Sequence, residues 1–174
     1  APATVMRPES RVTTPAAEGM TGHLTSPFGW RADPFTGAQR FHGGIDIRAA
    51  YGESVPAAAG GIVVEAGERG AYGLTVVVEH ESGIRTRYAH LSALAVSGGD
   101  RVDQGQEIGR VGQSGRATGP HLHFEVVRDG QRINPEGVLT AFGEGLAGLK
   151  LAGRYADYRS DRRTSPADGA DDES

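Results

Sequence analysis

Two histidines separated by one residue stand in the segment PHLHFEVV at positions 120–127. Successive side chains of a strand point to opposite faces. A strand here would therefore carry His121, His123 and Glu125 on one face and apolar side chains on the other. Two imidazoles on one face of a rigid strand can converge on one point, as a metal site or an acid/base pair requires. The same alternation is typical of solvent-facing histidines beside a core, so the pair alone leaves both interpretations open.

A second candidate lies in the segment FHGGIDI, where His42 precedes Asp46 by four positions. An imidazole nitrogen and a carboxylate oxygen are both ordinary zinc ligands. Gly43 and Gly44 disfavour a helix, so we expect a tight loop that enters a short strand. Glycine permits the backbone curvature that would bring His42 and Asp46 together. Taken alone, the segment is better interpreted as a glycine-rich turn with an incidental histidine.

The third candidate is His90, in the segment RYAHLS. If residues 84–91 form a regular strand, Ile84, Thr86, Tyr88 and His90 share one face. A single histidine near the end of a strand is more often structural than catalytic.

Together, these residues have the composition of a zinc hydrolase site. Such sites keep three protein ligands and leave the fourth position to water. His42, Asp46 and one residue of the pair His121 and His123 would supply three ligands. The other member of the pair and His90 would be free imidazoles, able to polarise that water or to stabilise an oxyanion. The spacing does not decide which histidine of the pair is the ligand.

The elements that must position these residues are short strands. From Thr21 to about Pro135, apolar segments alternate with glycine-containing turns, which is typical of an all-β domain. Ser82-Gly83 is expected to form a tight hairpin turn, and Asp129-Gly130 a second turn. The expected strands are Ile62–Glu68, Leu74–His80, Ile84–Leu91, Glu107–Val111 and His121–Val127.

The pattern changes after Ile133. Asn134 can cap a helix that begins with Pro135, and apolar residues follow at roughly helical spacing up to Leu151. A short C-terminal helix is therefore predicted over 137–153, although three glycines in this stretch weaken the pattern.

Composition excludes several classes of function. The 174 residues include no cysteine, which excludes disulfide scaffolds, thiolate zinc fingers and cysteine nucleophiles. Acidic residues outnumber basic ones by 22 to 18, but four acids lie in the last eight residues. The rest of the chain is balanced, so no nucleic-acid partner is expected. No apolar run approaches the roughly 20 residues of a membrane-spanning helix.

Three segments closely resemble motifs of the lysostaphin/LytM-type zinc endopeptidases of bacterial cell walls. These are HGGIDI at 42–47, YAHL at 88–91 and GPHLHFEV at 119–126. The connecting sequences match too, and the likeness runs in order from about Gly22 to Pro135. All five candidate positions are present.

The resemblance implies that one Zn²⁺ ion is bound by His42, Asp46 and His123, and that His90 and His121 are a catalytic pair that does not bind zinc. It implies an antiparallel β-sheet domain with a groove whose floor carries the metal. The implied reaction is hydrolysis of a peptide bond in the stem or cross-bridge of peptidoglycan. The resemblance does not choose between a D,D cross-link and a glycine bridge.

Glu125, two residues beyond His123, has two interpretations. It is expected either to orient an imidazole through a hydrogen bond or to be an exposed residue of the strand.

We expect a linker or pro-segment at 1–20, a LytM-type metallopeptidase domain at 21–136, a helical extension at 137–153 and a flexible, acidic-ended tail at 154–174. The first segment lacks the apolar stretch of a signal peptide. The resemblance implies a periplasmic, secreted or cell-wall-associated protein, with a regulatory partner or the pro-segment as a further contact. The alternative is a catalytically silent relative that binds peptidoglycan or activates a cell-wall amidase; the complete set of five residues favours the enzyme.

Overall fold

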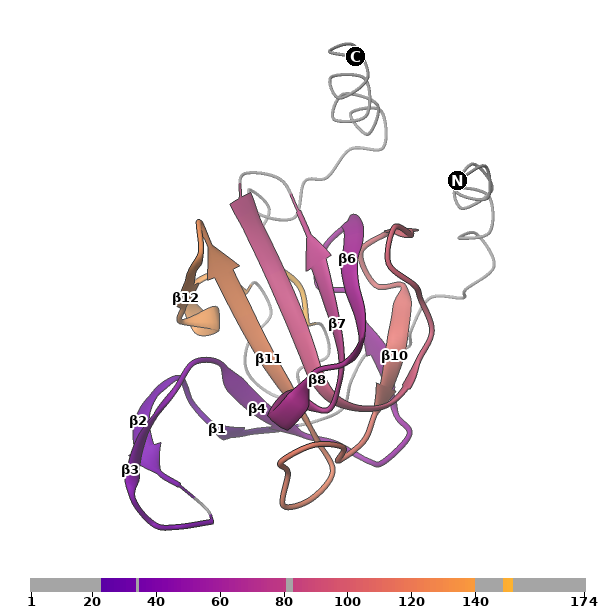
Figure 1. Cartoon of the computed structure of the whole chain (residues 1–174). Helices are drawn as coiled ribbons and strands as arrows, with labels where there is room; N and C mark the ends of the chain where they lie inside the picture. Colours follow the sequence, from indigo (N-terminus) through magenta and orange to yellow (C-terminus); the bar gives the residue numbers. More distant parts are fainter. Residues whose placement is uncertain (1–22, 34, 81–82, 140–148, 152–174) are drawn as a thin grey trace.

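The computed structural model describes residues 23–33, 35–80, 83–139 and 149–151. These residues form a ten-stranded sheet and a separate two-stranded sheet (Figure 1), and the pairings are antiparallel, so the predicted all-β architecture is confirmed. The predicted linker at 1–20 and tail at 154–174 lie outside the described residues. No helix in the described ranges is long and apolar enough to cross a membrane.

The main sheet is built from long neighbouring strands. Its path runs through β1 (His23–Ser26), β4 (Ile45–Arg48), β11 (His121–Arg128), β8 (Ile84–Leu94), β7 (Leu74–Glu79), β6 (Gly61–Glu68) and β9 (Arg101–Val102). Figure 1 shows β11, β8 and β7 side by side at its centre. The five predicted strands are all present, with ends displaced by at most a few residues.

Shorter strands complete the sheet. β5 (Ser54–Pro56) pairs with β10 (Glu107–Val111), which also pairs with β8. β12 (Gln131–Ile133) pairs with β11 through the predicted turn at Asp129-Gly130. Both turn residues have positive φ, 50° and 84°, as a two-residue turn that matches the strand twist requires.

The core lies on one face of the central strands. Leu122, Phe124 and Val126 of β11 are fully buried, as are Ile45 and Ile47 of β4. Residues of β5, β7, β8 and β10 belong to the same apolar cluster. Burial of this face orients the intervening residues of β4 and β11 toward the opposite face, where the candidate site lies.

A two-stranded hairpin of β2 (Gly29–Ala32) and β3 (Gln39–His42) stands at the lower left of Figure 1. In its register Arg31 lies opposite Arg40, and Gly29 lies opposite His42. β3 thus ends at a candidate metal ligand.

The predicted C-terminal helix is not found in the described part of the chain. Asn134 does act as an N-cap, because its side chain accepts a hydrogen bond from the Glu136 amide at 3.0 Å. The helix that follows is only the 3₁₀ turn η5 (Pro135–Gly137), and Leu139 then forms an isolated antiparallel bridge with Leu151. Both leucines are buried in the core, so at these two positions tertiary packing overrides the weak helical pattern; residues 140–148 lie outside the described ranges.

Candidate metal centre

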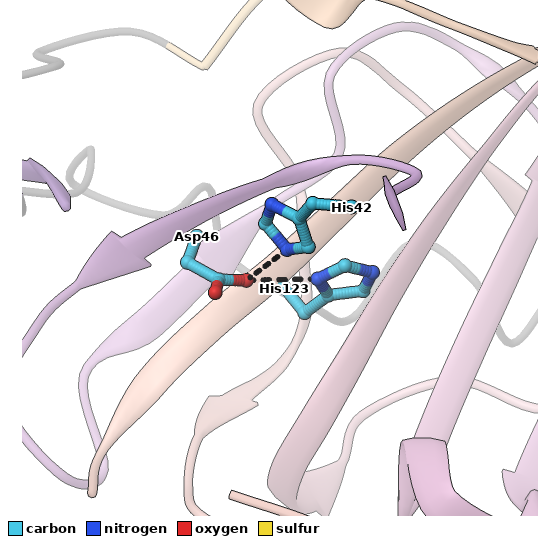
Figure 2. Close-up of side chains that lie close together, drawn as sticks. All are labelled: His42, Asp46 and His123. Atoms are coloured by element: carbon cyan, nitrogen blue, oxygen red, sulfur yellow. Dashed lines mark hydrogen bonds and ion pairs between the residues drawn. The ribbon is translucent and has the colours of Figure 1, made fainter. Parts of the chain in front are cut away.

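Three residues from different strands meet at one point. His42 ends β3, Asp46 lies in β4, and His123 lies in β11 directly opposite Asp46. His42 Nε2 is 3.2 Å from Asp46 Oδ1, and His123 Nδ1 is 2.8 Å from the same oxygen (Figure 2). One ligand atom from each residue lies within 4.8 Å of the other two. The structure thus brings together the three predicted zinc ligands.

Gly44 explains how His42 and Asp46 meet despite their separation along the chain. A Cβ at Gly44 would collide with the backbone carbonyl of Phe124, so the loop lies against β11. Only glycine permits this close approach without displacing the backbone. Gly44 therefore helps to set the position of both candidate ligands.

The outward nitrogens of the two ligand histidines determine which atoms point inward. His42 Nδ1 lies 2.8 Å from the Pro27 carbonyl, which can only accept a hydrogen bond, so Nδ1 carries the proton. His123 Nε2 lies 2.9 Å from Glu125 Oε2 and donates to that carboxylate. His42 Nε2 and His123 Nδ1 are thus left for a metal beside an Asp46 oxygen. Two imidazole nitrogens and one carboxylate oxygen are a donor set that suits zinc.

The charge state of the carboxylates is consistent with this assignment. Burial disfavours ionisation of Asp46, but the neighbouring imidazoles of His123 and His42 hold its pKa well below the usual range. Burial likewise opposes ionisation of Glu125, and its hydrogen bond with His123 keeps its pKa lowered. Burial also disfavours the charged form of His123, but Asp46 and Glu125 raise its pKa.

His90 reaches the site through a β-bulge. Val76 pairs with Tyr88 and Leu74 pairs with Leu91, so β8 has one more residue than β7 between these pairs. His90 lies in this interval with φ of 61°, in the left-handed region that few non-glycine residues adopt. The prediction that His90 and Tyr88 share a face is therefore wrong: Tyr88 is in the core, whereas His90 lines the groove.

His90 and His121 form a second pair of imidazoles beside the three ligands. Their ring centroids are 4.9 Å apart, and His121 Nε2 is 3.8 Å from Asp46 Oδ1. His90 Nδ1 donates to the Ser114 carbonyl at 2.7 Å, and His121 Nδ1 donates to the Gly119 carbonyl at 2.9 Å. Burial lowers the pKa of His90 to about 4, so the Nε2 of its ring is an unprotonated acceptor at neutral pH.

Glu125 is fully buried and bonded, so its interpretation as an exposed strand residue is wrong. Besides His123, its carboxylate accepts hydrogen bonds from the Tyr72 hydroxyl at 2.9 Å and from Arg87 at 3.0 Å. Sequence reasoning missed Tyr72 and Arg87. Both residues are remote from Glu125 along the chain. Arg87 meets Glu125 only because β8 and β11 pair in a register that places these two residues opposite each other.

The five candidate residues line an open groove of about 740 Å³. The β2–β3 hairpin and the loop before β11 both contribute to its walls. Asp33 joins these walls, because it forms ion pairs with Arg40 at 2.8 Å and with Arg116 at 3.2 Å. Burial opposes ionisation of Asp33, but hydrogen bonds from the Phe35 amide and the two arginines lower its pKa.

Two histidines, His80 and His23, are not among the five candidate site residues. His80 is buried, and it contacts the Gly60 carbonyl and the Thr86 hydroxyl, each at 2.8 Å. These contacts within the core indicate a structural role for His80. The side chain of His23 lies outside the described part of the structure.

Comparison with known proteins identifies the class to which this fold and site belong. Residues 40–135, more than half of the chain, match the model of peptidase family M23. The chain therefore belongs to this family, and the resemblance to lysostaphin/LytM-type peptidases is confirmed.

Two relatives of this chain are named for different functions. The chain is 45% identical over 115 residues to the DD-carboxypeptidase/endopeptidase Mpg of Neisseria meningitidis, an alignment that covers 66% of this chain and 26% of that protein. It is 43% identical over 93 residues to the murein hydrolase activator EnvC of Escherichia coli, covering 53% of this chain and 22% of that protein. The chain thus spans about a quarter of the length of these relatives.

Two solved structures share the fold. The catalytic domain of the antimicrobial peptidase lysostaphin from Staphylococcus simulans is 30% identical, with a TM-score of 0.61, and the match covers 67% of this chain and 90% of that one. A zinc-containing peptidase from Vibrio cholerae is 34% identical, also with a TM-score of 0.61, and the match covers 70% of this chain and 39% of that one.

Proposed function

We propose that this protein is a zinc-dependent endopeptidase that hydrolyses peptide bonds in the stem or cross-bridge peptides of bacterial peptidoglycan. The single observation that carries the proposal is the arrangement of five side chains in one groove. Three of them present inward-facing donor atoms within 4.8 Å of one another, and two further imidazoles stand beside them. Membership of family M23 and the endopeptidase activity for which the Neisseria relative is named support it.

The assigned zinc ligands are His42 through Nε2, Asp46 through Oδ1 and His123 through Nδ1. A bound zinc ion would lower the pKa of water toward about 7 and would polarise the scissile carbonyl as a Lewis acid. The Pro27 carbonyl and Glu125 hold the two imidazoles in the tautomers that this assignment needs.

The assigned catalytic residues are His90 and His121. Each has its Nδ1 proton bonded to a backbone carbonyl, which leaves Nε2 free to accept a proton from the attacking water or to donate one to the oxyanion or leaving amine. Their rings lie beside the ligand group, within the groove that would hold the peptide.

The second candidate function is that of a catalytically silent regulator. The observation that favours it is the similarity to EnvC, which is named as an activator of murein hydrolases. The complete five-residue set favours the enzyme, because a regulator needs neither three convergent metal donors nor two adjacent free imidazoles.

Action on peptidoglycan implies a location outside the cytoplasm. We therefore keep the periplasmic, secreted or wall-associated assignment as part of the proposal. We also propose that the domain has a regulatory contact. This contact is either residues 1–20, acting as an intramolecular pro-segment, or a separate regulatory protein.

Zinc content and product analysis test the proposal together. The purified protein is expected to contain about one zinc ion per chain, measured by elemental mass spectrometry. Digestion of defined muropeptides, some with D,D cross-links and some with glycine bridges, is expected to yield products that mass spectrometry assigns to one bond. A chelator should abolish this activity, and zinc should restore it.

The control is the same muropeptide digestion with zinc but without the protein. A protein that binds no metal and shows no metal-restored hydrolysis of either substrate contradicts the proposal. Stoichiometric zinc without hydrolysis would favour the regulator.

A further inference from the structure

The groove is lined by an excess of arginines over acids, and one of these arginines has no acidic partner in the part of the chain that the structure describes. The arginines are Arg31, Arg40, Arg48, Arg116 and Arg132, and the acids are Asp33, Asp46 and Glu125. Each cation except Arg48 forms an ion pair with one of these acids, at 2.8 to 3.6 Å. Within the described residues, the guanidinium of Arg48 forms no ion pair or hydrogen bond, and the side chain is exposed.

The strand register places Arg48 next to the proposed catalytic residues. Arg48 follows Asp46 by two positions in β4, so both lie on the face opposite the core residue Ile47. In the pairing of β4 with β11, Arg48 lies directly opposite His121. Directly opposed side chains of an antiparallel pair have Cβ atoms about 5 Å apart. The Arg48 guanidinium is thus presented to the groove on the His121 side.

Resting on the proposed function, we propose that Arg48 is a specificity-determining residue that binds a free carboxylate of the peptide substrate next to the scissile bond. A guanidinium offers a planar fork of N–H donors that matches a carboxylate with two parallel hydrogen bonds. The three groove acids pair with other arginines, which leaves the Arg48 guanidinium available to an anionic group of the substrate. Peptides whose carboxylate is converted to an amide lose this ion pair.

The test compares two substrates and three variants. The substrates are a synthetic cross-linked stem-peptide dimer with free carboxyl groups and the same dimer with these groups amidated. R48Q is expected to lower kcat/KM for the free acid by roughly fivefold, the upper range for a solvent-accessible ion pair, and to leave the amidated dimer unchanged. R48K should recover part of the preference, since it keeps the charge without the fork.

The matched control is R85Q, which removes the same charge from β8. Arg85 does not line the groove, and its partner is Glu79 at 3.7 Å. R85Q should leave both substrates unaffected, and thermal unfolding should show that all variants are folded. Equal losses on both dimers in R48Q, or no loss on either, overturn the proposal.

A binding measurement separates this proposal from the proposed function. Calorimetric titration of the zinc-loaded protein with each dimer should show that wild type prefers the free acid and that R48Q does not. If neither dimer is cleaved but this preference is found, the endopeptidase assignment fails and the Arg48 assignment stands. If the dimers are cleaved but bind wild type and R48Q alike, the endopeptidase assignment stands and the Arg48 assignment fails.

Discussion

At the residue scale, the oxygen that each site histidine contacts sets the role of its other ring nitrogen. His42, His90 and His121 each donate from Nδ1 to a backbone carbonyl, which leaves Nε2 toward the groove. His123 is reversed, because Glu125 takes its Nε2 proton and Nδ1 faces Asp46. The same residue type can therefore serve as a metal ligand through either nitrogen.

The first prediction separates metal binding from catalysis. His123→Ala should lose zinc, because it removes one of three ligands. His90→Ala should retain zinc while hydrolysis falls by at least about 100-fold, the lower range for loss of a general acid or base. Elemental analysis and muropeptide digestion measure the two effects. Equal loss of zinc in both variants would show that the roles are wrongly assigned.

A second residue-scale prediction concerns Glu125 as a positioning residue. Glu125→Gln keeps the side-chain size but removes the charge that orients and polarises His123. Zinc affinity should fall by roughly 10- to 100-fold, as is typical when the hydrogen-bond partner of a ligand is changed. Competition with a fluorescent chelator measures it.

The control for Glu125→Gln is Glu65→Gln, which alters a carboxylate paired with Arg69 outside the groove. Wild-type zinc affinity in Glu125→Gln would contradict the positioning role.

At the scale of elements, the strands follow from local patterns but the bulge does not. Alternation and turn residues predict β7, β8, β10 and β11 to within a few residues. The extra residue in β8 depends on how β7 pairs with it, and only this pairing turns His90 away from the Tyr88 face. A residue in the left-handed region must be held by its surroundings, here by the Ser114 carbonyl and the neighbouring strands.

The prediction at this scale concerns His80, which links the end of β7 to β8 through Thr86. Burial lowers its pKa from 6.5 to about 4. Between these pH values the unfolded state binds more protons than the folded state, so stability is fully present above about pH 6.5 and falls as the pH is lowered toward 4. The loss from this group is on the order of 3 kcal/mol.

Chemical denaturation between pH 7 and pH 4.5, with EDTA present throughout, measures the effect. His80→Gln cannot titrate and should show a smaller loss of unfolding free energy than wild type over this range. Parallel pH profiles would refute the assignment. Both proteins retain the site histidines, so their titration contributes to each profile.

At the scale of the whole molecule, the core extends beyond the segment that the family model matches. Leu149 and Leu151 are each 1% exposed and belong to the main apolar cluster. The Leu151 amide donates to the Ala58 carbonyl at 2.9 Å. Residues 149–151 are therefore part of the packed domain.

Leu151→Ala is expected to destabilise the protein by about 2–5 kcal/mol, because it leaves a cavity in the core. Zinc content should be unchanged, since Leu151 does not line the groove. Leu24→Ala is the matched control: Leu24 is 37% exposed, and its loss should cost less than about 1 kcal/mol. Denaturant unfolding measures both, and equal effects would contradict a structural role for the C-terminal segment.

The sequence by itself determined the five longest strands, the core face of β11 and the set of candidate residues, because these depend on residue type and on a period of two along the chain. The C-terminal helix that it predicted is not found in the described residues, since leucine spacing does not reveal the strand-like bridge between Leu139 and Leu151.

Tertiary structure alone decided what depends on contacts between distant segments. It set the orientation of His90, the inward nitrogen of each histidine, the burial of Glu125 beneath Tyr72 and Arg87, and the exposure of Arg48 opposite His121. Each results from strand register and from which oxygen meets a given side chain, and no local pattern encodes either.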